Sequence, residues 1–162
     1  MLAESLPGRP EFTVLADAVI ARLDAEDDQS VLAALAERLT AAGHVTETFA
    51  AAVRDRERQY PTGLPTSVPC AIPHTDLRHV RRSGVAVATL ARAVSFGMMG
   101  TSGEERLDVE LVIMLVLGDG HTQVGALQHL VARLHDPDAA RPLLGAPDDG
   151  GLRIAAEAWL AG

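Results

Sequence analysis

The sequence predicts an α/β or α+β fold, because segments typical of strands and segments typical of helices alternate along the chain. The most apolar segment, residues 107–118 (LDVELVIMLVLG), predicts a strand that is buried on both faces of a sheet. Residues 27–43 (DDQSVLAALAERLTAAG) carry leucines at the spacing of a helix. The length of 162 residues suits one domain with a sizeable core, so we expect residues 1–162 to form a single domain.

The N-terminal part of the chain predicts a strand followed by a helix. Residues 13–24 (TVLADAVIARLD) can supply an opening strand. In the helix predicted from residues 27–43, the leucines recur three and four residues apart and therefore lie on one face. We expect Ser30 to cap the start of this helix and Gly43 to end it.

A second helix and a further strand are predicted in the middle of the chain. The helix should run from about residue 46 to residue 59, where Pro61 and Gly63 break it into the loop YPTGLPTSVP at residues 60–69. Residues 83–91 (SGVAVATLA) show partial alternation, which predicts a strand.

The C-terminal part predicts two helices after the buried strand. Gly118 and Gly120 should close that strand, and a helix should start near His121 or Thr122. The apolar face of this helix carries Val124, Leu127, Val131 and Leu134. Residues 148–160 (DDGGLRIAAEAWL) predict a last amphipathic helix.

Composition and charge exclude several classes of function. Hydrophobic residues make up 48% of the chain and charged residues 22%, as in an ordinary soluble globular protein. The net charge is −8 and there is no run of lysine or arginine, which disfavours nucleic acid as a partner. A single cysteine, Cys70, cannot form a disulfide framework or a multi-cysteine zinc motif, so we expect it to be a small buried hydrophobe.

The sequence predicts neither a membrane-inserted segment nor a targeting segment. Its longest apolar runs fall far short of the length that crosses a bilayer. Residues 1–12 (MLAESLPGRPEF) lack the basic start and the long apolar core of a signal peptide. We therefore expect a cytoplasmic protein that binds another protein or a small ligand.

The motifs of several metal-dependent and nucleotide-dependent enzymes do not occur in the sequence. His74 and His79 are five residues apart with Pro73 beside the first, unlike the i,i+4 histidine pair of a zinc protease. There is no G-x-S-x-G or Walker pattern, and residues 97–103 (GMMGTSG) lack the strand-to-helix context of a dinucleotide fingerprint. We expect neither a bound metal nor a cofactor.

Two residues, Arg56 and His121, stand where an anion could bind. In the second predicted helix the apolar stripe of Phe49 and Val53 advances by three residues to Arg56, so we expect Arg56 to face inward. An inward guanidinium needs an anionic partner, either a carboxylate of the protein or a phosphate. His121 lies at a predicted helix start, where free backbone N–H groups favour an anion, although a histidine there can also be a simple cap-region residue. Spacing alone does not bring Arg56, His74 and His121 together.

Four segments share a pattern with one known family. Residues 56–64 (RERQYPTGL) hold an arginine–glutamate pair followed by a Pro-Thr-Gly turn, and residues 70–76 (CAIPHTD) contain Ile-Pro-His. Residues 93–103 (AVSFGMMGTSG) hold Val-x-Phe-x-x-Met-Gly, and residues 111–134 (LVIMLVLGDGHTQVGALQHLVARL) combine a buried strand, a histidine and a leucine-rich helix. In this order they resemble the type-2 enzyme IIA (EIIA) domains of the sugar phosphotransferase system (PTS), the fructose–mannitol class, and especially its galactitol-type branch. The resemblance spans about residues 13–160.

The resemblance implies a three-layer αβα sandwich with a mixed central sheet flanked by helices. It also implies a phosphocarrier in the uptake of a sugar or polyol, with His74 as the phosphorylated nucleophile. His74 would accept a phosphoryl group from the phosphohistidine of HPr and pass it to a IIB component, and a membrane IIC transporter would be an indirect partner. Arg56 and His121 would stabilise the phosphoryl group, and no metal would be required.

The residues around His74 suit this chemistry. An imidazole with the ordinary pKa of about 6.5 has a free lone pair at neutral pH. Pro73 fixes its own φ and biases Ile72 to an extended conformation, which should hold the imidazole in one direction. We also hypothesise that Thr75 or Asp76 hydrogen-bonds a ring nitrogen or a loop amide and so fixes which nitrogen attacks.

Two other functions fit the same sequence. A regulatory IIA-like module of the nitrogen type would accept phosphate chiefly as a signal and bind other proteins. A non-catalytic relic would keep the fold and have lost the phosphoryl relay. Phosphoryl transfer to a cognate IIB component separates a carrier from a regulator.

Overall fold

The computed structural model describes residues 13–118 and 120–162, with the backbone alone for residues 120–124 and 126. The strands are β1 (Val14–Leu23), β2 (Gly63–Leu64), β3 (Cys70–Ala71), β4 (Gly84–Gly97) and β5 (Arg106–Val116). The helices are α1 (Asp28–Ala41), α2 (Phe49–Gln59), the 3-10 turn η1 (Leu77–His79), α3 (Gly120–Leu134), α4 (Pro137–Leu144) and α5 (Asp149–Ala161).

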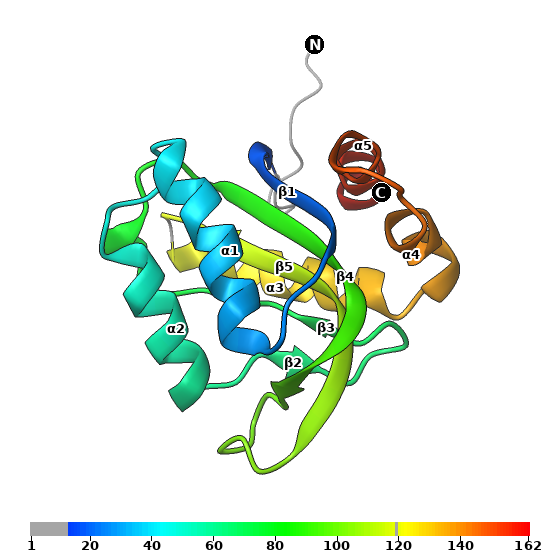
Figure 1. The fold of residues 1–162 in the computed structure, drawn as a ribbon, viewed down its shortest axis with the longest axis horizontal. Helices are drawn as coiled ribbons and strands as arrows, with labels where there is room; N and C mark the ends of the chain where they lie inside the picture. The colour runs from blue at the N-terminus through cyan, green and yellow to red at the C-terminus, as the bar shows by residue number, and fades with distance from the viewer. Residues whose placement is uncertain (1–12, 119) are drawn as a thin grey trace.

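The strands form one mixed sheet in the order β1-β4-β5-β3-β2 (Figure 1). The pair β1·β4 and the pair β3·β5 are parallel, whereas β4·β5 and β2·β3 are antiparallel. The prediction of a mixed sheet flanked by helices is confirmed. The strand predicted from residues 107–118 is central β5.

Both faces of the sheet are buried under helices, which produces two apolar cores. Val85 and Val87 of β4 belong to the core formed with α3, α4 and α5. Ala86 and Ala88, the alternate residues, belong to the core formed with α1 and α2. The same alternation continues from Leu111 to Val116 of β5, which explains the continuous apolar sequence of this part of the strand. Full burial of each large side chain contributes roughly 1.5–3 kcal/mol.

The β4–β5 hairpin is long enough to bring its tip to the edge strand β2. The two strands pair from Gly84 opposite Val116 to Gly97 opposite Arg106, with an irregularity between Thr89 and Val94. The amide of Met99 then donates to the carbonyl of Gly63 at 2.8 Å. The segment GMMGTSG therefore belongs to a hairpin and not to a nucleotide-binding loop.

Several predicted helix boundaries need correction. Ser30 does not cap α1, because the carboxylate of Asp27 accepts the amide hydrogen of Ser30 and is the N-cap. Gly43 does follow the helix end, with a φ of 79° that favours glycine. Helix α2 starts at Phe49, later than predicted, with Thr48 at the N-cap position.

The C-terminal helices differ from prediction in number. Helix α3 starts at Gly120, close to the expected position, and α5 lies within the last predicted amphipathic segment. Helix α4, capped by Asp136, was not predicted. No helix in the described part of the chain is long and apolar enough to cross a membrane.

Candidate functional site

His74 follows β3, in a segment whose backbone is held from both sides. The amide of Ile72 donates to the carbonyl of Thr62 at 3.3 Å, and the carbonyl of Pro73 accepts from the amide of Leu115 at 2.9 Å. Pro73 itself has a restricted φ. These restraints, one on each side of the Ile72–Pro73 peptide bond, fix the position from which the imidazole projects.

One ring nitrogen of His74 is bound by the main chain. The Nδ1 atom lies 2.9 Å from the carbonyl oxygen of Ile72. Because a carbonyl oxygen only accepts, Nδ1 carries the hydrogen in the neutral ring and Nε2 keeps the free lone pair. The main chain, and not Thr75 or Asp76, therefore holds Nδ1, and the carboxylate of Asp76 pairs with Arg78 at 2.9 Å.

The surroundings of His74 favour its neutral form. Burial of the ring lowers the pKa of His74, and the positive charge of Arg56 lowers it further. The hydrogen bond to Ile72 acts in the opposite direction without reversing the shift. At neutral pH the imidazole is therefore uncharged and nucleophilic.

A pocket of about 450 Å³ lies beside His74. Its wall is formed by the C-terminal end of α2 with Arg56, by residues 59–62 and by residues 99–102 of the β4–β5 hairpin tip. Sequence reasoning did not place the hairpin tip at this site, since only the tertiary pairing of Met99 with Gly63 brings it there.

Arg56 lies at this pocket, but its orientation was predicted wrongly. Its side chain is exposed, and the buried stripe of α2 advances by four residues from Phe49 to Val53 and then to Glu57. The guanidinium lies over the ring of Tyr60, 5.2 Å from its centroid. Within residues 13–118 and 120–162, no carboxylate forms an ion pair with Arg56, so its charge is available to an anion in the pocket.

The neighbouring arginines of α2 are engaged elsewhere. The Nε atom of Arg54 donates to Gln29 at 3.2 Å, and Arg58 pairs with Asp55 at 2.6 Å. Of these three arginines, Arg56 alone lines the pocket.

The structure does not test the prediction for His121. Its backbone lies in the first turn of α3, directly after the segment that leaves β5. Its side chain lies outside the described residues. The helix start agrees with the expectation that backbone N–H groups are available near this position.

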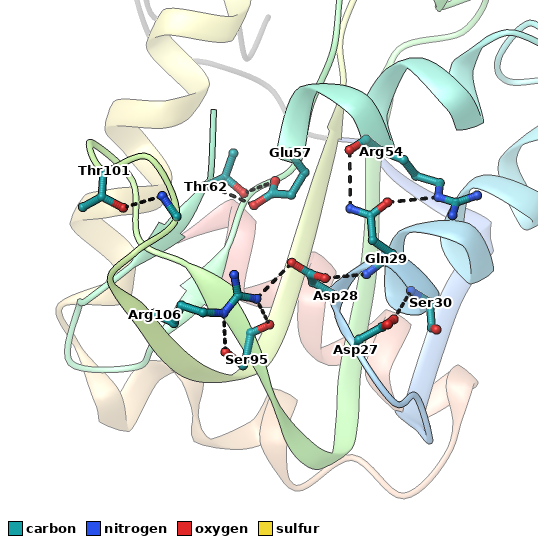
Figure 2. A network of polar contacts seen from close by, with 11 residues as sticks. Asp27, Asp28, Gln29, Ser30, Arg54, Glu57, Thr62, Ser95, Thr101 and Arg106 are labelled. Atoms are coloured by element: carbon teal, nitrogen blue, oxygen red, sulfur yellow. Dashed lines mark hydrogen bonds and ion pairs between the residues drawn. The ribbon is translucent and has the colours of Figure 1, made fainter. Parts of the chain in front are cut away.

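Glu57 is a functional candidate that the sequence reasoning missed. Its carboxylate is buried and accepts two hydrogen bonds from Thr62, one from the amide and one from the hydroxyl, each at 2.8 Å (Figure 2). Burial raises the pKa of Glu57 to about 7, although the two bonds from Thr62 lower it. A four-residue step in the helical stripe would have identified Glu57 as the inward residue.

The raised pKa of Glu57 predicts an unusual pH dependence of stability. Between about pH 4.5 and pH 7 the native carboxyl holds a proton that the unfolded chain has released, so stability falls as the pH rises through this range. The shift corresponds to a loss of about 3 kcal/mol in the free energy of unfolding, with no further change at higher pH. Urea unfolding of wild type and Glu57→Gln between pH 4.5 and pH 8 measures this contribution.

The difference between the two proteins isolates Glu57, because all other titrating groups are shared. The exposed Glu47, just before the same helix, supplies a matched control. Glu47→Gln should keep the pH profile of the wild type. Parallel profiles for wild type and Glu57→Gln would contradict the prediction.

Comparison with known proteins agrees with this fold. Residues 14–152 match the family model described as the phosphoenolpyruvate-dependent sugar phosphotransferase system, EIIA 2. The galactitol-specific EIIA component of Escherichia coli K12 is 28% identical over 75% of this chain and 81% of its own length.

Two solved structures share the fold. A complex of mannitol enzyme IIA with phosphorylated mannitol enzyme IIB from Escherichia coli matches with a TM-score of 0.72 and 23% identity, covering 94% of this chain and 99% of the other. The crystal structure of mannitol IIA from Escherichia coli matches with a TM-score of 0.71 and 21% identity, covering 89% of this chain and 99% of the other.

These findings first define a class, the phosphoryl-carrying components of a sugar phosphotransferase system. More narrowly, the chain belongs to the EIIA type-2 family, as its sequence motifs indicated. It is thus a phosphotransferase component that works through a phosphohistidine intermediate.

Proposed function

We propose that this protein accepts a phosphoryl group on Nε2 of His74 from the phosphohistidine of HPr and passes it to a IIB component. The observation that carries the proposal is the bond from Nδ1 to the carbonyl of Ile72, which leaves the lone pair of Nε2 free. Among the described residues, His74 is the one histidine that lines the pocket.

The transfer exchanges one phosphorus–nitrogen bond for another. The lone pair of Nε2 attacks phosphorus while the bond between phosphorus and the HPr imidazole breaks, and the electron pair of that bond returns to the HPr nitrogen. Nδ1 of His74 keeps its hydrogen throughout. Its hydrogen bond to the carbonyl of Ile72 stabilises the positive charge that the ring gains on phosphorylation. In the second transfer a nucleophile of the IIB component attacks phosphorus, the bond between phosphorus and Nε2 of His74 breaks, and the electron pair of that bond returns to Nε2.

The pocket supplies the positive charge that this reaction needs. Negative charge spreads over the equatorial oxygens of the transferred group, and the guanidinium of Arg56, which has no ion pair among the described residues, lies at the same pocket to stabilise it. We assign a second stabilising role to His121, at the N-terminus of α3, where backbone N–H groups also favour an anion.

The surface around the pocket suits protein partners. Tyr60 and Met99, which line the pocket, are 62% and 40% exposed, and Leu77, three residues after His74, is 46% exposed. Exposed apolar side chains grouped around a reactive residue are typical of a docking surface. HPr and the IIB component would dock here in turn, in the cytoplasm, and a membrane IIC transporter would be an indirect partner through IIB.

The proposal is tested by incubation with enzyme I, HPr and labelled phosphoenolpyruvate, followed by addition of a IIB component. We expect a label that is stable in alkali and lost in acid, as for a phosphohistidine, and that moves to IIB. Nitrogen-15 NMR of the phosphorylated protein should place phosphorus on Nε2. Label on Nδ1, or no label at all, would contradict the proposal, and label that no IIB component removes would favour a regulator.

A further inference from the structure

We propose that Glu57 and Thr62 are positioning residues, which hold the imidazole of His74 in the tautomer and direction required for phosphoryl transfer. The inference rests on the proposed function of His74. It assigns Glu57 and Thr62 a role exerted through the main chain of Ile72 and not in bond formation, and it explains why a carboxylate is buried beside this pocket.

A continuous chain of hydrogen bonds joins Glu57 to His74. The carboxylate of Glu57 accepts from the amide and the hydroxyl of Thr62, both at 2.8 Å. The amide of Ile72 donates to the hydroxyl oxygen of Thr62 at 3.2 Å and shares its hydrogen with the carbonyl of Thr62 at 3.3 Å. The carbonyl of Ile72 accepts from Nδ1 of His74 at 2.9 Å.

In each of these hydrogen bonds the donor and the acceptor are determined by the chemistry of the groups. Above about pH 7, where Glu57 is ionised, its carboxylate can only accept, so the hydroxyl hydrogen of Thr62 points to Glu57 and a hydroxyl lone pair is left for the amide of Ile72. The amide of Ile72 is thereby held in place, and its carbonyl accepts from the imidazole of His74. The ring must then present its N–H at Nδ1, which leaves Nε2 for phosphorus.

Burial makes this arrangement strong. Glu57 is 4% exposed, Thr62 3% and Ile72 1%, so water does not compete for these hydrogen bonds. A buried hydrogen bond to a charged group contributes more than one between neutral groups, and an unsatisfied buried partner is costly. Loss of the Thr62 hydroxyl would therefore leave the buried carboxyl of Glu57 without one of its two donors.

The same bonds also place Arg56 relative to His74. Arg56 precedes Glu57 in α2, and both residues lie near the C-terminal end of that helix. The two hydrogen bonds between Thr62 and Glu57 hold Thr62 against α2. The distance between Arg56 on α2 and the segment that carries His74 is thereby fixed. Phosphoryl transfer depends on such placement, since a shift of about 1 Å can cost a hundredfold in rate.

The test replaces Thr62 by valine, which keeps the shape of the side chain and removes its hydroxyl. We expect nitrogen-15 NMR to show that the Nδ1–H tautomer of His74 loses population to the Nε2–H tautomer. We also expect phosphorylation by phospho-HPr to slow roughly ten- to a hundredfold, as for other residues that orient a reactive group indirectly. Thr62→Ser, which restores the hydroxyl, should restore both the tautomer and the rate.

Thr89→Val is the matched control. Thr89 is as buried as Thr62, at 3% exposure, and its hydroxyl also accepts a backbone amide hydrogen, from Arg22 at 2.9 Å. It lies in β4, outside the pocket beside His74. Thr89→Val should lower stability while leaving the tautomer and the rate of the wild type unchanged.

Glu57→Gln tests the other end of this series of hydrogen bonds. It decides whether Glu57 and Thr62 position His74 if Thr62→Val does not fold. The glutamine NH2 group would face a donor of Thr62 where the carboxylate accepts one. We therefore expect the Nδ1–H tautomer of His74 to lose population, but less than in Thr62→Val. An unchanged tautomer in Thr62→Val and Glu57→Gln, or an equal loss in Thr89→Val, would overturn the positioning role. The tautomer is read without HPr, so failure of the wild type to accept phosphate would refute the proposed function alone.

Discussion

Replacing His74 with alanine is expected to abolish phosphorylation by phospho-HPr completely. The variant lacks the nitrogen that forms the bond to phosphorus, and no neighbouring side chain at the described pocket is an equivalent nucleophile. Incubation with enzyme I, HPr and labelled phosphoenolpyruvate, analysed under alkaline conditions, measures the loss. The side chain is half-buried at a pocket and does not fill a core, so the variant should fold.

A second histidine variant controls for non-specific labelling. His79 is the nearest other histidine in the sequence, and its Nδ1 atom is bonded to the hydroxyl of Thr48 at 2.8 Å. His79→Ala should accept as much phosphate as the wild type. Label on His74→Ala, or its loss from His79→Ala alone, would show that another residue carries the phosphoryl group.

The architecture could be predicted from the sequence where apolar residues follow a clear period. Residues 107–118 predicted β5 correctly, because both faces of that strand are covered by apolar cores. The leucine spacing of residues 27–43 predicted α1 correctly. The two-residue strands β2 and β3 have no period to detect, since they exist through pairing with each other and with β5. Helix α4 was hidden for a different reason, because it is short and contains Pro137 and Pro142.

Local capping was ambiguous in the sequence for a physical reason. Asp27, Asp28 and Ser30 are all good capping residues within one short segment. The backbone decides between them: Asp27 has the extended φ of −151° that a cap requires, and its side chain reaches the amide of Ser30.

The sequence identified two residues of the pocket, His74 and Arg56, and not its geometry. His74 and Arg56 do lie at one pocket, as the resemblance implied. The orientation of Arg56 was wrong because a helical stripe can advance by three or by four residues, and here Phe49 and Val53 lead to Glu57. A three-residue step would have buried the guanidinium and required an internal partner, whereas the four-residue step leaves it free at the pocket.

Replacing Arg56 with alanine is therefore expected to slow phosphoryl transfer strongly without affecting the fold. The exposed guanidinium makes no ion pair within the described residues, so its loss removes a charge from the pocket and little packing. Loss of a positioned donor to a developing negative charge costs roughly a hundred- to a thousandfold in rate. Quenched-flow measurement of His74 phosphorylation should show this loss, and Arg56→Lys should recover part of the rate, because it restores the charge without the planar fork.

The pH profile separates this role from a general loss of positive charge. Burial is the main cause of the lowered pKa of His74, and Arg56 adds to it, so Arg56→Ala should raise this pKa and move the acidic limb of the rate profile to higher pH. Arg58→Ala, two residues further along the same helix, removes an equal charge from a side chain that is paired with Asp55. It should keep both the rate and the profile of the wild type, because its guanidinium is outside the pocket. An equal slowing in Arg56→Ala and Arg58→Ala would mean that the net charge of this surface, and not one guanidinium beside His74, assists the transfer.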